Sequence, residues 1–270
     1  MKKKKLDLEG KISLITGGTS GIGLAIAETF ISSGSDVIII GTNKEKGQAI
    51  AKRLDSAQPR CAFFKCDVGS RDQVKDVCKK ILNRFAKVDV MVLNAGTEFT
   101  EAIEEIRPEH WQRVMDVNLS GPFYFIRYLI GPMIKQKKGN IIITSSVVSL
   151  TGAGGGMHYS ASKAGLRGIV GRINYELLCK GIRANLISPG VIDTPMLRKK
   201  YPDAPKFNKI LESQIPCGRI GTPQDVADLA LFLASDLSDY ICGQDILIDG
   251  GRTFHRRPKG SLVSDSYDPK

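Results

Sequence analysis

Short, nearly continuous apolar runs alternate along the chain with longer stretches of helical periodicity. The apolar runs predict strands buried on both faces, since such strands need no polar alternation; they cover residues 12–16, 36–41, 61–65, 89–93, 140–144, 184–187 and 246–248. The periodic stretches predict helices over residues 22–33, 44–54, 72–85, 109–135, 160–180 and 223–234. Thr222 followed by Pro223 marks one helix start, with the capping residue first and the proline just inside it.

This alternation predicts an α/β fold of the doubly wound, Rossmann-like type. Right-handed crossovers between successive strands give a parallel sheet of about seven strands with helices on both faces. No low-complexity linker interrupts the pattern, so we expect a single domain over residues 6–251. Residues 1–5 form a basic N-terminal extension. Residues 252–270 combine charges with glycine, proline and serine, and we expect a flexible C-terminal tail there.

The formal net charge of +11 does not by itself indicate a nucleic-acid partner, because much of it lies at the ends of the chain. Residues 1–11 carry five lysines against two acids, and residues 252–270 carry five basic residues against two acids. No basic helix with interleaved aromatics is present, so we expect no nucleic acid. A weak attraction to acidic substrates or partners stays open.

Six scattered cysteines lack the paired spacing of a metal site, so no bound metal is expected. They suit reduced thiols in a cytoplasmic protein. No apolar run is long enough to cross a bilayer, and we expect no membrane association.

A glycine-rich segment, Thr-Gly-Gly-Thr-Ser-Gly-Ile-Gly at residues 16–23, follows the first predicted strand and opens the first helix. Its glycines permit a tight turn and a close approach of the backbone to a ligand. The helix N-terminus supplies free N–H groups and a partial positive charge for a pyrophosphate. Glycines often only make turns, but the strand–turn–helix context favours dinucleotide binding.

Tyr159 and Lys163 lie four residues apart in a predicted helix, which puts both side chains on one face. A phenol titrates near pH ~10, and a fixed ammonium stabilises its anion and lowers its pKa towards the range useful for acid–base chemistry. Alone, such a pair is more often a solvated helix face. Its neighbours in the sequence decide the interpretation.

Taken in order, these features resemble the short-chain dehydrogenase/reductase family, whose glycine motif is Thr-Gly-x-x-x-Gly-x-Gly. The resemblance runs from about residue 8 to Gly251 and includes the Asn-Ala-Gly motif at residues 94–96. It also includes the Pro-Gly-x-x-x-Thr motif at residues 189–194 and the last strand within residues 243–251. The resemblance implies four catalytic residues: Asn118, Ser146, Tyr159 and Lys163. Ser146 is preferred to Ser145 because it precedes Tyr159 by the family's usual 13 positions.

The resemblance also implies the reaction, a hydride transfer between nicotinamide C4 and a carbonyl or carbinol carbon. Tyr159 would donate a proton to the oxygen in reduction and remove it in oxidation. Lys163 would lower the pKa of Tyr159 and bind the nicotinamide ribose, and Ser146 would bind the substrate oxygen. Asn118 would hold a water that links Lys163 to solvent, although it also suits a helix kink or cap. His158 is assigned no catalytic role.

The implied cofactor contacts extend along the whole chain: Gly17, Thr19, Ser20, Gly21, Ile22, Gly23, Thr42, Asn43, Asp67, Val68, Asn94, Ala95, Gly96, Tyr159, Lys163, Pro189, Gly190, Ile192 and Thr194. Enzymes that use NAD carry an acid at the end of the second strand to bind the ribose 2′-OH, and residues 41–43 hold none. Lys44 adds a nearby positive charge. NADP(H) is therefore favoured over NAD(H), although Ser20 stands where NADP enzymes of the family often carry arginine.

Within the family, the chain is most similar to 3-oxoacyl-acyl-carrier-protein reductases and to sugar or polyol dehydrogenases. A small-molecule or acyl-thioester substrate is implied, and acyl carrier protein is a candidate partner that would dock on basic residues at the positions of Lys137 and Lys180. The substrate loop is expected at residues 195–216, where the basic side chains of Arg198, Lys199, Lys200 and Lys206 favour either an anionic substrate or a solvated flap.

Two further alternatives and one expectation about assembly follow from the sequence. A steroid alcohol would be an alternative substrate to a sugar or polyol, and a non-catalytic dinucleotide sensor is disfavoured by the intact catalytic set. The family usually assembles as homodimers or homotetramers through two long helices, here residues 109–135 and 160–180.

Overall fold

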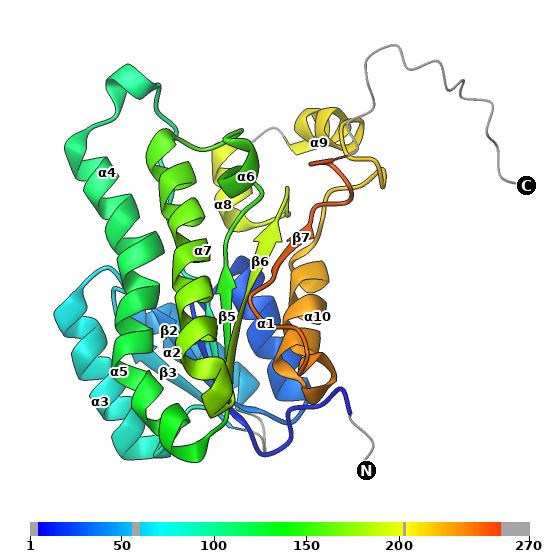
Figure 1. The fold of residues 1–270 in the computed structure, drawn as a ribbon. Coiled ribbons are helices and arrows are strands. Elements are labelled where there is room, and N and C mark those ends of the chain that lie inside the picture. Colours follow the sequence, from blue (N-terminus) through cyan, green and yellow to red (C-terminus); the bar gives the residue numbers. More distant parts are fainter. Residues whose placement is uncertain (1–4, 56–59, 202–203, 255–270) are drawn as a thin grey trace, which may run out of the picture.

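The molecule is built on one parallel sheet. Within residues 5–55, 60–201 and 204–254, which the computed structural model describes, seven strands lie in the order β3-β2-β1-β4-β5-β6-β7 (Figure 1). They are β1 (Ile12–Thr16), β2 (Asp36–Gly41), β3 (Cys61–Lys65), β4 (Val90–Leu93), β5 (Gly139–Thr144), β6 (Ile182–Pro189) and β7 (Asp245–Ile248). Every strand pair is parallel, which confirms the predicted doubly wound α/β fold.

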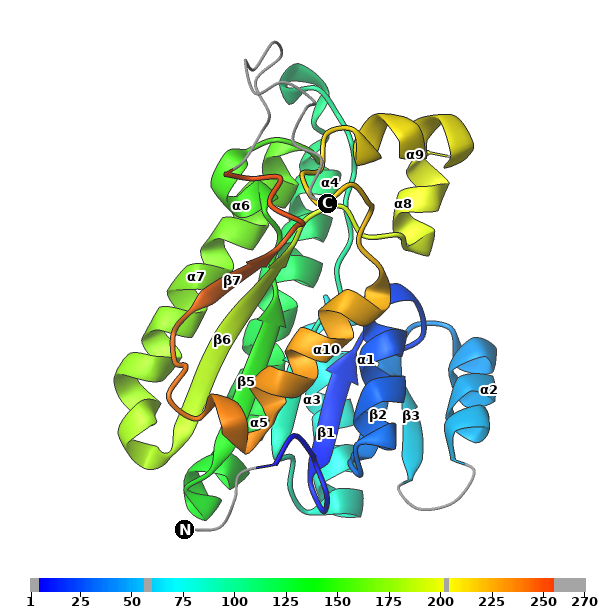
Figure 2. The same ribbon diagram turned by 90° about the vertical axis from the view of Figure 1, so that its right-hand side faces the viewer.

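Helices cover both faces of the sheet, as the two perpendicular views show (Figures 1 and 2). One face carries α3 (Arg71–Phe85), α4 (Pro108–Met115), α5 (Gly121–Gln136) and α7 (Met157–Leu177). The other carries α1 (Gly21–Ser32), α2 (Lys44–Leu54) and α10 (Pro223–Ala234). The shorter helices α6 (Val148–Thr151), α8 (Pro195–Lys200) and α9 (Ala204–Glu212) lie at the carboxyl end of the sheet (Figure 2).

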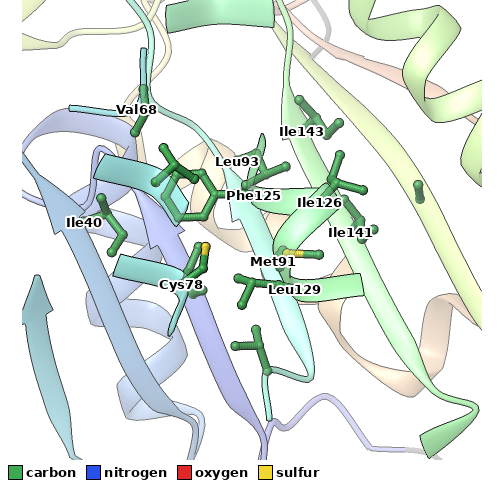
Figure 3. Packing of buried hydrophobic residues seen from close by; sticks show 14 of the residues in the cluster. Ile40, Val68, Cys78, Met91, Leu93, Phe125, Ile126, Leu129, Ile141 and Ile143 are labelled. Carbon is green, nitrogen blue, oxygen red and sulfur yellow. The ribbon is translucent and has the colours of Figure 1, made fainter. Parts of the chain in front are cut away.

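Two apolar clusters, one on each face, explain why the strand sequences are continuously hydrophobic. Along β2, Ile38 and Ile40 pack in the cluster beneath α3 and α5, whereas Ile39 packs in the cluster beneath α1 and α10. Figure 3 shows the first cluster, in which Phe125 of α5 lies among side chains of β2, β4 and β5. Fully burying one such side chain contributes about 1.5 to 3 kcal/mol.

The predicted helix over residues 109–135 is wrong in one respect, because the structure divides it. α4 and α5 are joined by a π-helical turn, η2 (Asp116–Ser120). Pro122 has no N–H, so it cannot make the bond to the carbonyl of Asn118 that an uninterrupted α-helix requires. Asn118 lies in this turn, and such π-bulges are common at functional sites.

The observed ends of other helices differ from the predicted ends by a few residues. The predicted helix over residues 160–180 begins earlier, at Met157, and its end tightens into η3 (Leu178–Lys180). Two further 3₁₀ turns are η1 (Ile103–Glu105) and η4 (Asp236–Ser238). The expected basic extension and the expected tail lie mostly outside the described residues. In the part of the chain that is described, no helix has the length and apolar character to span a bilayer.

Candidate active site

A cavity of about 520 Å³ opens at the carboxyl end of the sheet. The strand order reverses between β1 and β4, and ligands of doubly wound sheets bind at such a switch point. Most of the expected site residues line this cavity: Gly17, Ser20, Gly21, Ile22, Asn94, Ala95, Gly96, Ser146, Tyr159, Lys163, Pro189, Gly190, Ile192 and Thr194. The structure thus brings together residues from five separate segments of the chain.

The glycine loop between β1 and α1 has the shape of a cradle. Gly17 adopts φ +68°, and a Cβ placed there would lie 3.0 Å from Ala95 Cα. A Cβ at Gly23 would lie 2.3 Å from the carbonyl oxygen of Gly17, so only glycine allows the helix to begin this close to the loop. Ser20 caps the helix without a side-chain hydrogen bond, which leaves the N-terminus of α1 to a ligand. These features fit a pyrophosphate.

Asn94 joins the ends of three strands. Its backbone N–H donates to Thr16 Oγ1 at 2.9 Å, its Nδ2 donates to the Thr16 carbonyl at 3.2 Å, and its Oδ1 accepts from Thr144 Oγ1 at 3.2 Å. The side chain therefore holds β1, β4 and β5 in register at the cavity. Its role in the structure is to shape the site.

Tyr159 lies in the first turn of α7 and shares a side-chain hydrogen bond with Ser146. Burial raises the pKa of Tyr159 to about 12, the nearby Glu98 carboxylate adds to the rise, and the bond with Ser146 opposes it. The expected lowering of this pKa by Lys163 is not found. At neutral pH the phenol is protonated, so this arrangement suits a proton donor.

Lys163 points into the site from the next turn of α7. Its Nζ donates to the carbonyl of Thr144 at 2.8 Å and lies 5.7 Å from the centre of the Tyr159 ring. Because the ammonium is only 4% exposed and the carbonyl is neutral, burial lowers the pKa of Lys163 to about 8. Burial therefore shifts the two groups in opposite directions, because it raises the pKa of Tyr159 and lowers the pKa of Lys163.

The stability of the protein should depend on pH through Lys163. Between about pH 8 and 10.5 the folded protein has released this proton while the unfolded chain still holds it, so stability should rise with pH. We expect wild type to gain on the order of 2 kcal/mol relative to Lys163→Met between about pH 8 and 10. Urea unfolding of both proteins across this range measures the difference. Parallel pH profiles would contradict it.

Asn118 lies behind Lys163 and does not line the cavity. Its Oδ1 accepts from the Thr97 N–H at 2.8 Å, and its Nδ2 donates to the Thr97 carbonyl at 2.9 Å and to Ser162 Oγ at 3.1 Å. It therefore fixes the loop after β4 against α7. Asn118 also lies in the π turn η2, which agrees with the alternative interpretation of Asn118 as a residue at a helix kink. Its expected role in holding a water stays a prediction.

Ser145, the alternative to Ser146, also lines the cavity, whereas His158 was expected to have no catalytic role. Ser145 Oγ donates to the carbonyl of Lys163 at 3.2 Å and is 2% exposed. His158 is completely buried and does not line the cavity, so it does not face a substrate there.

Six of the expected cofactor contacts do not line this cavity. Two belong to the glycine loop, Thr19 and Gly23, and four lie at the ends of β2 and β3: Thr42, Asn43, Asp67 and Val68. Asn43 caps α2, with its Oδ1 accepting from the Lys46 N–H at 2.8 Å. The Asp67 carboxylate accepts two hydrogen bonds from Arg113, at 2.8 and 3.1 Å. Partial burial opposes ionisation of Asp67, but the bonds from Arg113 and the Gly69 N–H outweigh it and lower its pKa. Asp67 is thus already bound by a cation, which the sequence did not indicate.

Several cavity residues were missed by the sequence analysis. Glu98, which follows the Asn-Ala-Gly motif, pairs with Lys200 of α8 at 3.3 Å across the mouth of the cavity. Arg252 lines the cavity although the domain was expected to end one residue earlier. No local pattern indicates Glu98, because its role depends on where α8 lies. Of the other flap residues, Arg198 is bound by Asp193, and the side chain of Lys206 lies outside what is described.

A sheet of this topology with a glycine cradle and a Ser–Tyr–Lys set defines a nicotinamide-dinucleotide-dependent oxidoreductase that acts on CH–OH groups. When bound, the dinucleotide supplies or accepts the hydride. Comparison with known proteins agrees, because the family model described as enoyl-(acyl carrier protein) reductase matches residues 17–253. The chain belongs to the short-chain dehydrogenase/reductase family.

Individual relatives cover nearly the whole chain. The 3-oxoacyl-acyl-carrier-protein reductase of Thermotoga maritima is 40% identical over 244 residues, which cover 90% of this chain and 98% of the relative. The enzyme of that name from Chlamydia pneumoniae is 37% identical, with 92% and 99% covered. Among solved structures, a gluconate 5-dehydrogenase from Burkholderia cenocepacia in complex with NADP and tartrate is 30% identical, with a TM-score of 0.87 and 93% and 98% covered.

Proposed function

We propose that the protein reduces a 3-oxoacyl thioester to the 3-hydroxyacyl thioester with NADPH. The observation that carries this proposal is the joint placement of Tyr159, Ser146 and Lys163 beside the glycine cradle in one cavity. At neutral pH the Tyr159 phenol, with its raised pKa, carries the proton that reduction needs, so it can donate this proton as the hydride arrives. Ser146 would stabilise the charge that develops on the carbonyl oxygen.

The thioester is supported by the 3-oxoacyl-acyl-carrier-protein reductases that resemble this chain over nearly its full length. The expected docking residues Lys137 and Lys180 do not border the cavity of their own chain. Both lysines follow the C-terminal ends of their helices, α5 and α7, whereas Tyr159 lies at the N-terminal end of α7. Because α7 is 21 residues or about 30 Å long, the lysines lie at the end of the helical layer opposite Tyr159 (Figure 1). Lys200 and Arg252 line the cavity instead.

A sugar acid or polyol is the second candidate substrate, supported by the likeness to the gluconate 5-dehydrogenase structure. Turnover of an acetoacetyl thioester, gluconate and other polyols, and a steroid, each with both cofactors, separates the two. The proposal expects the highest kcat/KM for the acetoacetyl thioester. A higher kcat/KM for gluconate oxidation would overturn it, and an enoyl thioester tests the reaction named in the family description.

NADPH is proposed as the preferred form of the cofactor, because no acid lies at residues 41–43 to repel the 2′-phosphate. Thr42 is exposed at the end of β2, so Thr42→Asp would add a carboxylate there without disturbing the core. We expect it to lower the ratio of kcat/KM for NADPH to that for NADH by roughly 100-fold. Thr42→Asn has nearly the same shape without the charge and should keep the preference. A wild-type ratio below one would contradict the proposal.

The expected homodimer or homotetramer and the cytoplasmic location stay predictions. Exposed aromatic side chains on the two helices expected to assemble, Phe123 of α5 and Tyr175 of α7, support a protein partner there. Sedimentation of the purified chain tests the assembly.

A further inference from the structure

His158 is the buried residue closest in sequence to Tyr159, and it contacts that residue directly. Its Nδ1 accepts a hydrogen bond from the backbone N–H of Tyr159 at 3.1 Å. The imidazole is completely buried, tilted against Phe99 with ring centres 6.2 Å apart. It therefore lies next to the expected proton donor but outside the cavity lining.

The start of α7 explains why this bond matters. The first N–H groups of a helix have no partner within the helix, and the side chain of the capping residue usually accepts from the third residue. Here the cap is Gly156, which has no side chain, and Tyr159 is the third residue. His158 Nδ1 supplies the missing acceptor. A Cβ at Gly156 would lie 2.3 Å from His158 Cε1, so the ring occupies the space of a capping side chain.

The other ring nitrogen of His158 faces a carboxylate. Because Nδ1 accepts a hydrogen bond, the proton of the neutral ring is on Nε2, which lies 3.7 Å from Glu101 Oε2. Both atoms are buried without a hydrogen-bond partner. Glu101 is itself held by His110, whose Nδ1 lies 2.7 Å from Oε1, and His110 stacks on Phe99. The carboxylate therefore favours the tautomer that caps α7.

We propose that His158, whose Nε2 faces Glu101, is a positioning residue that fixes the first turn of α7 and thereby the direction of the Tyr159 hydroxyl. This inference rests on the proposed reaction, in which that hydroxyl donates the proton. The phenol follows the backbone of residue 159, so a turn that loses its cap moves the hydroxyl away from Ser146. A displacement of about 1 Å at a reacting group can cost about 100-fold in rate.

Three variants of His158 distinguish the role of Nδ1 from the role of Nε2. His158→Asn keeps an acceptor near the position of Nδ1, His158→Gln keeps a donor near Nε2, and His158→Leu keeps only volume. We expect Leu and Gln to lower kcat roughly tenfold, with KM for NADPH unchanged, and Asn to recover most of the loss. Circular dichroism and Tm for each variant confirm that folded protein is compared. A kcat for the Leu variant within about twofold of wild type, or equal losses for Asn and Leu, would overturn the proposal.

Gly156→Ser offers a second test, because its expected effect on kcat is opposite in wild type and in a His158→Ala background. In wild type, Gly156→Ser places a Cβ against the His158 ring and should lower kcat. In a His158→Ala background that ring is gone, and the serine hydroxyl can accept from the Tyr159 N–H as an ordinary cap. There the same substitution should raise kcat above that of His158→Ala alone, and a further fall would contradict the cap. If Tyr159→Phe retains wild-type turnover, the proposed reaction is wrong. If Tyr159→Phe loses turnover but the His158 variants retain it, only the positioning role of His158 is wrong.

Discussion

Tyr159→Phe is expected to lower kcat by roughly 10² to 10⁴-fold, the range in which a positioned general acid contributes. The substitution removes only the hydroxyl, so the ring still fills its place beside Gly155 and the cavity keeps its shape. Because Lys163 and the glycine loop remain, the dinucleotide should bind nearly as in wild type. Steady-state kcat with NADPH and an acetoacetyl thioester, together with the Kd for NADPH from fluorescence titration, measures both effects.

Tyr175→Phe provides the matched control for this substitution. Tyr175 lies on the same helix and is 82% exposed, so the same loss of a hydroxyl occurs far from the cavity. We expect wild-type turnover from it. Near wild-type turnover by Tyr159→Phe in a clean preparation would show that another group donates the proton.

Gly23→Ala is expected to weaken NADPH binding by about 100-fold or more, although it adds a single methyl group. The added Cβ would lie 2.3 Å from the Gly17 carbonyl oxygen and 2.7 Å from Asn94 Nδ2. Both are parts of the cradle, and a backbone oxygen cannot turn aside as a flexible side chain can. The loop must therefore move away from α1, which spoils its fit to the pyrophosphate. Titration of the protein with NADPH measures the Kd.

Gly168→Ala is the control for a methyl group added to a helical glycine. No atom lies within 4 Å of a Cβ at Gly168 in α7, and alanine is favoured over glycine inside a helix by about 0.5 to 1 kcal/mol. Its Tm should not fall and its Kd for NADPH should not change. Wild-type affinity in Gly23→Ala would mean that the loop does not cradle the dinucleotide.

Much of the fold was predictable because the strands are buried on both faces. A run such as Val37–Ile40 has no polar position, and Ile39 and Ile40 indeed face opposite clusters. The grouping of Tyr159 and Lys163 in one cavity was predictable too, because helical spacing puts both side chains on one face. The family resemblance then places Ser146 beside them.

What the sequence could not show depends on contacts between distant segments. Burial and the charge of Glu98 set the pKa of Tyr159, and both arise only when the loop after β4 folds over α7. Arg113 binds Asp67 across 46 positions of sequence, which no spacing rule indicates. The π turn at Asn118 had one local signal, the missing N–H of Pro122, which a helical pattern of apolar residues conceals.

Deuterium transfer is the sharpest test of the proposed hydride transfer from NADPH to a 3-oxoacyl thioester. The wild-type protein is mixed with NADPH deuterated at the transferable C4 position and an acetoacetyl thioester, and the product is examined by mass spectrometry. We expect a 3-hydroxybutyryl thioester with deuterium on C3, formed by wild type and nearly absent with Tyr159→Phe. Unlabelled product, or no reduction of the thioester while another carbonyl substrate is labelled, would contradict it.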